Sequence, residues 1–283
     1  MKNRFNKHLI IVGSARSGTS WLAETIAGQH RYRLLFEPEH EYHTKNGILI
    51  CDRDLNPHNI SLQAENYLKK IFANQVDNDW IAQCSNRKLK RHLWPWIPKK
   101  LIIKFVRANL AAHLMNEHFQ IPLIHILRNP YDVIHSQQRV RFPWLYDLRY
   151  FQEQEEFVEM VNSLYKINLK EIDNYSEIQV LAVRWCLENV IPLQVKPPYA
   201  FKAKVVYHEE LRNDIEQFLD LCEYFNLEPL PDLSKKYNLP SSKTHPRSEI
   251  RGAEVNQYKF SKTEKKEINN ILDTFNCELY PRQ

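Results

Sequence analysis

Two short segments of the sequence combine cations, hydroxyl groups and a tight turn in the manner of anion-binding sites. The first, residues 13–20, has the sequence GSARSGTS and carries Arg16 between two glycines. The second, residues 128–136, has the sequence RNPYDVIHS and begins with Arg128. Guanidinium groups and the backbone N–H groups at a helix N-terminus both bind phosphate and sulfate oxygens. Each segment therefore predicts a site for an anionic ligand.

The first segment is nearly a Walker A loop, but it lacks the lysine. Gly13 and Gly18 have the Walker spacing, and Thr19 and Ser20 follow directly. In nucleoside triphosphatases a lysine after the second glycine reaches the β- and γ-phosphates. Thr19 in that position, with Arg16 inside the loop, argues against an ordinary triphosphatase. A strand–turn–helix joint with a chance pair of glycines is the alternative.

The second segment begins where an apolar strand is expected to end. Ligands of open α/β sheets bind at the carboxyl ends of the strands, which favours Arg128 as a ligand-binding residue. Pro130 suits the first turn of a helix, because its missing N–H costs nothing there. Whether Ser136 faces Arg128 depends on how the turn folds. Taken alone, Arg128 would more simply form a surface ion pair.

Together the two motifs resemble those of the sulfotransferases that use 3′-phosphoadenosine 5′-phosphosulfate (PAPS). SARSGTSW at 14–21 is similar to the family's 5′-phosphosulfate loop, and 128–136 is similar to its 3′-phosphate motif. Weaker similarities follow in the family's order: Trp185, the YHEEL segment at 207–211, and Arg251–Gly252. The last pair resembles a basic element that completes the 3′-phosphate site in some members.

This resemblance implies transfer of a sulfuryl group from PAPS to an acceptor hydroxyl, with adenosine 3′,5′-bisphosphate (PAP) as product and no metal required. Arg16 and the loop amides would hold the 5′-phosphate and sulfate, while Arg128 and Ser136 would hold the 3′-phosphate. Trp21 would flank the adenine or else belong to the core. The expected donor-binding residues are Ser14, Ala15, Arg16, Ser17, Gly18, Thr19, Ser20, Trp21, Arg128, Ser136, Arg251 and Gly252.

Glu37 is the expected general base, with Lys104 and Arg16 completing the catalytic set. The family's cytosolic small-molecule branch has a lysine two residues before its histidine base. Here Lys104 is kept, but Val106 stands in the place of that histidine. The Glu37–Pro38 pair is instead similar to an E-P element of the carbohydrate sulfotransferases. Lys104 would then point at the bridging oxygen of the donor.

Other assignments of the base stay open. Glu37 would otherwise cap a backbone group or pair with an arginine, in which case Glu39, His40 or His43 would be the base. Arg107 would act like Lys104 or form an ion pair. Aromatic and histidine residues lie in segments 40–60, 80–98 and 139–150, where they would either line an acceptor pocket or pack insertions onto the core. They are His43, Trp80, Trp94, Trp96, Phe142, Trp144 and Tyr146.

The elements that must position these residues alternate between strand and helix, which predicts an α/β fold with a mainly parallel, P-loop-NTPase-like sheet flanked by helices. The expected strands are His8–Val12, Arg33–Phe36, Lys100–Val106, Pro122–Leu127 and Lys204–Tyr207. The expected helices are Thr19–Gln29, Ser61–Val76, Ala108–Phe119, Tyr131–Arg139, Tyr150–Lys170, Ser176–Val190, Glu209–Phe225 and Ser261–Phe275. Leu227–Tyr258 is expected to be a loop.

We expect one domain over residues 1–283, with the donor site built from about 7–38 and 100–140, and helical insertions at about 40–98 and 139–200. The chain carries 39 Lys and Arg against 34 Asp and Glu, an excess too small to require a nucleic-acid partner. Its five cysteines form no C-x-x-C pair, and no apolar run reaches membrane-spanning length. A cytoplasmic location is therefore expected.

Two other functions remain as alternatives. One is a small-molecule kinase with a degenerate P-loop, and the other is a nucleotide-binding protein without catalysis. The acceptor is expected to be a carbohydrate or another small hydroxyl compound. The sequence does not determine the oligomeric state.

Overall fold

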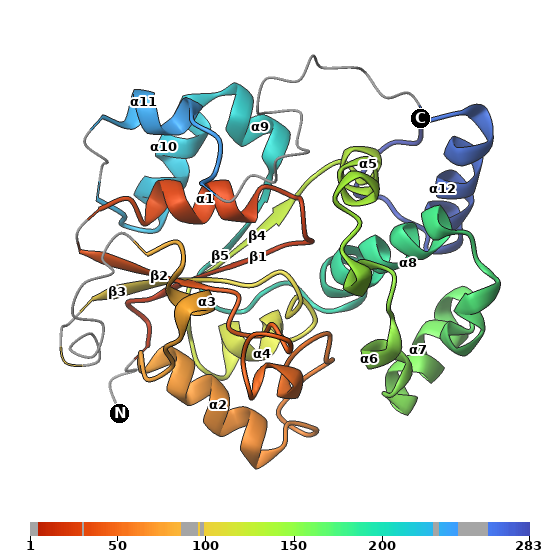
Figure 1. Ribbon diagram of the computed structural model, residues 1–283, viewed down its shortest axis with the longest axis horizontal. Coiled ribbons are helices and arrows are strands. Elements are labelled where there is room, and N and C mark those ends of the chain that lie inside the picture. The colour runs from red at the N-terminus through yellow and green to blue at the C-terminus, as the bar shows by residue number, and fades with distance from the viewer. Residues whose placement is uncertain (1–4, 30, 86–95, 97–98, 229–231, 243–259) are drawn as a thin grey trace.

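Five parallel strands form the sheet at the centre of the computed structural model (Figure 1). The structure describes residues 5–29, 31–85, 96, 99–228, 232–242 and 260–283. The strands are β1 (Leu9–Val12), β2 (Tyr32–Phe36), β3 (Lys100–Lys104), β4 (Leu123–Leu127) and β5 (Ala203–Tyr207), in the order β2-β3-β1-β4-β5. The predicted α/β class with a parallel sheet is confirmed.

Alternate residues of the central strand face opposite layers, so that each layer has its own apolar core. Leu9 and Ile11 pack with α1 (Thr19–Ile26), α10 (Ile215–Tyr224) and α11 (Leu233–Asn238). Ile10 and Val12 pack with α2 (Leu62–Phe72), α3 (Asp79–Ala82) and α4 (Ala112–Glu117). Because both faces are covered, the four strands β1 to β4 are mostly buried and mainly apolar, whereas the edge strand β5 is partly exposed.

A third apolar cluster lies beside the sheet, where Figure 1 shows a group of helices next to α5. These helices are α5 (Pro130–Val140), α6 (Arg149–Gln152), α7 (Glu155–Tyr165), α8 (Glu177–Val190) and α12 (Lys262–Thr274). Ser176 and Ser261 form capping boxes at the starts of α8 and α12. The S-x-x-Q and S-x-x-E spacings therefore begin helices where the sequence predicts them.

Three predicted elements were wrong. The predicted helix 150–170 is divided into α6 and α7. The break is at Gln154, whose side chain forms hydrogen bonds with backbone groups of Asp52, Asp54 and Tyr150. The predicted helix 209–225 is α9 (His208–Asn213) followed by α10, because Asp214 is extended and its side chain caps α10. The predicted loop 227–258 contains α11 among its described residues.

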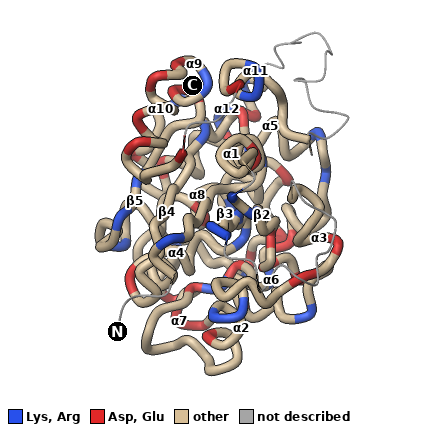
Figure 2. Tube along the Cα trace, turned by 90° about the vertical axis from the view of Figure 1, so that its left-hand side faces the viewer, with Lys and Arg blue, Asp and Glu red and all other residues tan. Residues whose placement is uncertain are grey.

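Charges of both signs are interspersed along the trace (Figure 2). On the face in view, blue and red segments both occur among the described residues. This distribution agrees with the small net charge of +5.

The turn between β1 and α1 requires glycine at position 18. Gly18 has φ of 94°, which is in the left-handed region, and its Cα lies against the ring of His208. A Cβ at this position would lie 2.2 Å from His208 Cδ2, far inside van der Waals contact. Both the backbone conformation and the packing therefore exclude a side chain here.

We expect Gly18→Ala to lower the free energy of unfolding by about 2–4 kcal/mol, from overpacking and from left-handed strain. Urea denaturation measures this loss. In a His208→Ala background, where the ring is gone, the same substitution should cost at least about 1 kcal/mol less. An equal loss in the two backgrounds would show that the ring contact does not set the need for glycine.

Candidate functional site

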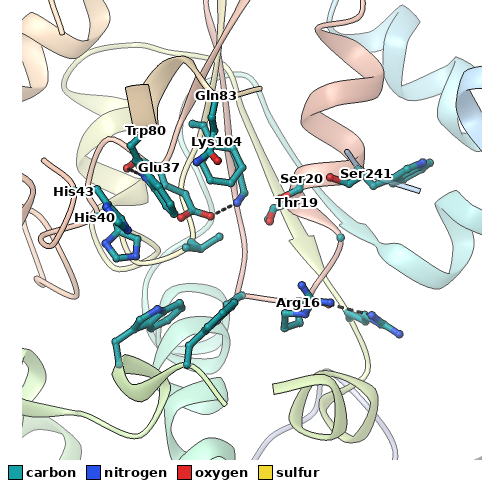
Figure 3. Close-up of a pocket in the computed structure, with 18 of the residues that line it drawn as sticks. Arg16, Thr19, Ser20, Glu37, His40, His43, Trp80, Gln83, Lys104 and Ser241 are labelled. Carbon is teal, nitrogen blue, oxygen red and sulfur yellow. Dashed lines mark hydrogen bonds and ion pairs between the residues drawn. The ribbon is translucent and has the colours of Figure 1, made fainter. Parts of the chain in front are cut away.

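A cavity of about 630 Å³ opens at the carboxyl ends of the strands, where ligands of open α/β sheets bind (Figure 3). Its volume lies in the range of small-molecule sites. Its lining residues come from the ends of all five strands and from the loops around them. They are Ala15, Arg16, Gly18, Thr19, Ser20, Trp21, Phe36, Glu37, His40, Tyr42, His43, Trp80, Gln83, Lys104, Val106, Arg128, Phe142, Pro143, Trp144, His208, Arg212, Pro240 and Ser241.

One end of the cavity holds two arginines close together. Arg128 Nη1 donates to the carbonyl oxygen of Arg16 at 3.0 Å, and Arg16 Nε donates to Ser136 Oγ at 3.0 Å. Burial, and then the neighbouring Arg128, lower the pKa of Arg16 to about 10. Arg128 Nη2 forms a long ion pair with Asp132 Oδ2 at 3.8 Å, as the alternative for Arg128 expected, but its Nε is buried without a hydrogen-bond partner. Among the described residues, no carboxylate forms an ion pair with Arg16. An anion at this end would relieve both deficits.

The N-terminus of α1 faces the same end of the cavity without a side-chain cap. Gly18 precedes the helix and supplies no capping oxygen. By contrast, α2, α5, α8, α10 and α12 each have a side chain that accepts from a first-turn N–H. Thr19 and Ser20 begin α1, and both line the cavity. The first-turn amides and hydroxyls of α1 are thus placed to bind an anion.

Two of the predicted donor-binding residues turn inward and brace the loop. Ser14 Oγ accepts from Asn189 Nδ2 at 2.7 Å, and the Ser14 carbonyl accepts from Ser17 Oγ at 2.6 Å. Neither serine lines the cavity, and both are buried. From α5, Gln137 Nε2 donates to the Ala15 carbonyl at 3.0 Å. The structure thus ties the first predicted motif to the second, and Ser136 joins them through Arg16.

Glu37 and Lys104 form an ion pair where the two ends of the cavity meet (Figure 3). The parallel register places Phe36 opposite Lys104, so that Glu37 lies just past the end of β3. Glu37 N donates to the Lys104 carbonyl at 2.9 Å, and Glu37 itself is left-handed with φ of 44°. Lys104 also lies over the Phe36 ring, with Nζ 4.1 Å from its centroid. The Glu37 side chain is therefore held by Lys104 and lines the cavity.

The alternative bases occupy different surroundings. Glu39 is fully buried and is not part of the cavity lining. Burial, and then the neighbouring Glu37, raise its pKa to about 8. His40 and His43 both line the cavity, but burial lowers the pKa of His40 to about 4. Of the two carboxylates considered as the base, Glu37 lines the cavity and Glu39 does not.

The other end of the cavity is an aromatic wall. His43 stacks on Trp80 with ring centroids 3.8 Å apart, and His40 lies edge-on to Trp80 at 4.9 Å. Phe142 and Trp144 form a second parallel pair, with centroids 6.1 Å apart. These rings line the cavity, as the sequence allowed, whereas Tyr146 packs against the helical cluster and Trp96 is exposed. Trp94 lies outside the described residues.

Arg107 forms a buried ion-pair network rather than lining the cavity. Its guanidinium binds Asp52 Oδ2 through Nε and Nη2, and Glu41 through Nη1. Arg184 donates to the same Asp52 oxygen at 3.2 Å and to Glu188 at 3.1 Å. The ion-pair alternative for Arg107 therefore agrees with the structure, and its positive charge is neutralised within the protein.

Sequence reasoning missed several lining residues, of which His208 and Arg212 are the most informative. His208 follows β5 directly, so its place at a strand end was the available signal. Arg212 lies over the Trp21 ring at 4.8 Å, and the Trp21 indole N–H donates to the Tyr237 carbonyl at 3.1 Å. Trp21 thus belongs to a core cluster and also lines the cavity. Arg251 and Gly252 lie outside the described residues.

No protein-family model matches the sequence, and a search of curated proteins also finds no match. Several solved structures that match over nearly the full chain are sulfotransferases by their titles. The sulfotransferase domain from the curacin biosynthetic pathway is 17% identical, with a TM-score of 0.47 over 96% of this chain and 98% of that chain. The sulfotransferase domain of the Synechococcus PCC 7002 olefin synthase is also 17% identical, with a TM-score of 0.46 over 96% and 95%.

Mouse sulfotransferase SULT7A1, complexed with PAP, is 13% identical, with a TM-score of 0.48 over 98% of this chain and 88% of that chain. At these low identities and TM-scores, the similarity does not by itself assign an activity to this chain. In the described part of the chain, no helix is long and apolar enough to cross a membrane.

The buried histidines predict how stability depends on pH. Burial lowers the pKa of His208 to about 3, and the neighbouring Arg128 and Arg212 add to the effect. The unfolded chain therefore takes up a proton near the ordinary value of 6.5, while the native protein does not. The contribution of His208 to stability is present above that value and is lost as pH falls, by about 1.4 kcal/mol per pH unit.

We expect His208→Gln to reduce the slope of unfolding free energy against pH between about pH 6 and pH 4. The reduction should be about 1.4 kcal/mol per pH unit, which is the contribution of one proton. Urea denaturation at several pH values measures the slope. His58→Gln, at an exposed histidine, serves as the control and should leave it unchanged. A slope that stays the same in His208→Gln would mean that His208 is protonated in the native protein.

Proposed function

We propose that this chain is a sulfotransferase that moves a sulfuryl group from PAPS to a hydroxyl of a small acceptor. The observation that carries the proposal is the pair of arginines, Arg16 and Arg128, beside the uncapped start of α1. A donor that carries several anionic groups, on its 5′ and 3′ positions, fits a site with two neighbouring cations. Lys104 lies at the end of β3, the strand beside β1. A magnesium-binding P-loop enzyme would need a carboxylate at this position instead of a cation.

In this mechanism the chain's residues act on a preassembled donor and acceptor. Arg16 and the α1 amides hold the 5′-phosphosulfate, and Arg128 holds the 3′-phosphate. Glu37 takes the proton from the acceptor hydroxyl while its oxygen forms the new bond to sulfur. The bond from sulfur to the 5′-phosphate oxygen breaks, and Lys104 stabilises the charge that develops on that leaving oxygen. Atoms and charge balance, with PAP and a sulfate ester as products.

The aromatic wall is the proposed acceptor site. Trp80 connects this wall to the base, since its indole N–H donates to the Glu37 carbonyl at 3.3 Å. Parallel rings such as His43–Trp80 and Phe142–Trp144 suit an acceptor with a flat or apolar face, including a sugar ring. The cations of the cavity lie toward the donor or are paired with Glu37. A carbohydrate or another small hydroxyl compound therefore fits this end of the cavity.

Ligand-induced stabilisation tests the donor assignment. We expect PAP to raise the melting temperature, because a ligand at 100 times its Kd adds about 2.7 kcal/mol of stability. Adenosine 5′-monophosphate should stabilise less, because it lacks the 3′-phosphate. Differential scanning fluorimetry with PAP, the monophosphate and magnesium-ATP measures the three responses.

Arg128→Met should lose the preference for PAP over the monophosphate, whereas Arg141→Met, at an exposed arginine that pairs with Glu177, should keep it. Stabilisation by magnesium-ATP in preference to PAP would favour the kinase alternative. Binding of PAP without any turnover of PAPS would favour a nucleotide-binding protein without catalysis.

Substitution of Glu37 tests the chemistry separately from binding. We expect Glu37→Gln to bind PAP as the wild type does and to lower kcat by about 10²- to 10⁴-fold, the usual contribution of a general base. The glutamine oxygen can still accept from Lys104, so that the buried ammonium keeps a partner. Release of PAP from PAPS with an acceptor measures turnover. Glu159→Gln, at an exposed residue of α7, is the control, and an active Glu37→Gln would place the base elsewhere.

A further inference from the structure

Three glutamates alternate along the segment after β2, and each contacts a different group at the end of β3. Glu37 pairs with the Lys104 ammonium, and Glu41 pairs with the Arg107 guanidinium. Between them, Glu39 Oε1 accepts hydrogen bonds from the backbone N–H groups of Val106 at 2.7 Å and of Arg107 at 3.0 Å. The three carboxylates thus connect the segment after β2 to the segment at and after the end of β3.

We propose that Glu39 is a positioning residue, whose hydrogen bonds to the Val106 and Arg107 amides hold the Glu37 carboxylate where it meets the acceptor hydroxyl. This inference rests on the proposed role of Glu37 as the base. Glu39 touches neither donor nor acceptor, because it is fully buried and lies outside the cavity lining.

The contact works through an oxygen acceptor and does not require a charge. Glu39 Oε2 is buried without a hydrogen-bond partner, and Oε1 carries both bonds. Burial together with the nearby Glu37 raises the pKa of Glu39, which favours the neutral form of the carboxyl. A protonated carboxyl still accepts on its carbonyl oxygen. A glutamine, which has the same shape and an equivalent oxygen, should therefore replace it.

The hydrogen bonds to Glu39 matter because the Glu37 backbone is in an unfavourable conformation. A φ of 44° is uncommon for a residue other than glycine and persists only where the surroundings enforce it. Glu39 fixes the chain on one side of Glu37, two residues away, and the Glu37 N–H fixes the other side on the Lys104 carbonyl. Between them, the Pro38 carbonyl accepts from Tyr67 Oη at 2.7 Å and from Thr44 Oγ1 at 2.9 Å.

Arg107 makes the anchor rigid. Its side chain is held between Glu41 and Asp52, and its carbonyl accepts from Asp52 N at 2.6 Å. The amide that Glu39 binds therefore belongs to a residue whose side chain and carbonyl are both fixed. Displacement of a catalytic group by about 1 Å can cost about 100-fold in rate, so the loss of this anchor should appear in kcat.

A matched pair of variants tests the proposal. Glu39→Gln keeps the oxygen acceptor, whereas Glu39→Met has a similar length and has no acceptor. We expect Glu39→Met to lower kcat by about 10- to 100-fold, with the KM for PAPS changed by less than about twofold. Glu39→Gln should keep kcat within about threefold of the wild type. An unchanged kcat in Glu39→Met, or an equal loss in both variants, would overturn the proposal.

Amide hydrogen exchange gives a readout that needs no turnover. The Val106 and Arg107 amides should exchange at least about tenfold faster in Glu39→Met than in wild type, and at the wild-type rate in Glu39→Gln. Equal protection in all three proteins would contradict the proposed contact. A wild type that neither binds PAP nor turns over PAPS would instead count against the proposed function, while the exchange comparison still decides the role of Glu39.

Stabilisation by PAP reports whether each variant is folded with an intact donor site. If Glu39→Met does not fold, Glu41→Gln replaces it, because it weakens the hold on Arg107 without touching the cavity. Its kcat should fall by about three- to tenfold, with the KM for PAPS unchanged. A Glu41→Gln variant with the wild-type kcat would overturn the proposal in that case.

Discussion

The burial of the Arg16 guanidinium beside Arg128 is the constraint around which one end of the cavity is organised. Burial, and after it the neighbouring Arg128, disfavour the charged form of Arg16 and lower its pKa to about 10. The loop tolerates this burial because neighbouring elements bind its carbonyls and hydroxyls. Arg128 donates to the Arg16 carbonyl, and Gln137 donates to that of Ala15. An anionic ligand would offset the electrostatic cost of the two neighbouring guanidinium groups. Part of the free energy that this cost takes from the stability of the free protein would then be recovered when the ligand binds.

Much of this site could be predicted from the sequence because of the rule that parallel strands present their carboxyl ends at one edge. Each of the four key residues, Arg16, Glu37, Lys104 and Arg128, lies at or just beyond the end of an apolar run. Their convergence in one cavity follows once the sheet is parallel. The strand pattern was sufficient because both faces of the sheet are covered at β1 to β4, which makes these strands short and mainly apolar.

The directions of side chains within the loops could not be predicted in the same way. Ser14 and Ser17 have hydroxyls suited to a phosphate, yet both bind within the protein. The partner of Ser14 is Asn189 of α8, which is more than 150 residues later in the chain, and Ser17 donates to the Ser14 carbonyl. The aromatic wall has the same origin, because Trp80 and Trp144 belong to different segments that only the tertiary fold brings together. The helix breaks at Gln154 and Asp214 likewise depend on side-chain hydrogen bonds to the backbone.

Backbone strain occurs in two of the loops that line the cavity, at Arg16 with φ of 77° and at Glu37 with φ of 44°. Each such residue costs about 1–3 kcal/mol, which the surrounding hydrogen bonds must offset. The two loops follow β1 and β2, which flank β3, so the sheet itself sets the distance between the proposed base and the proposed donor-binding loop. A site with this arrangement needs little reorganisation when its ligands bind. The Glu37–Lys104 pair and the two arginines are thus oriented before the reaction, which is the condition under which fixed charges lower a barrier most.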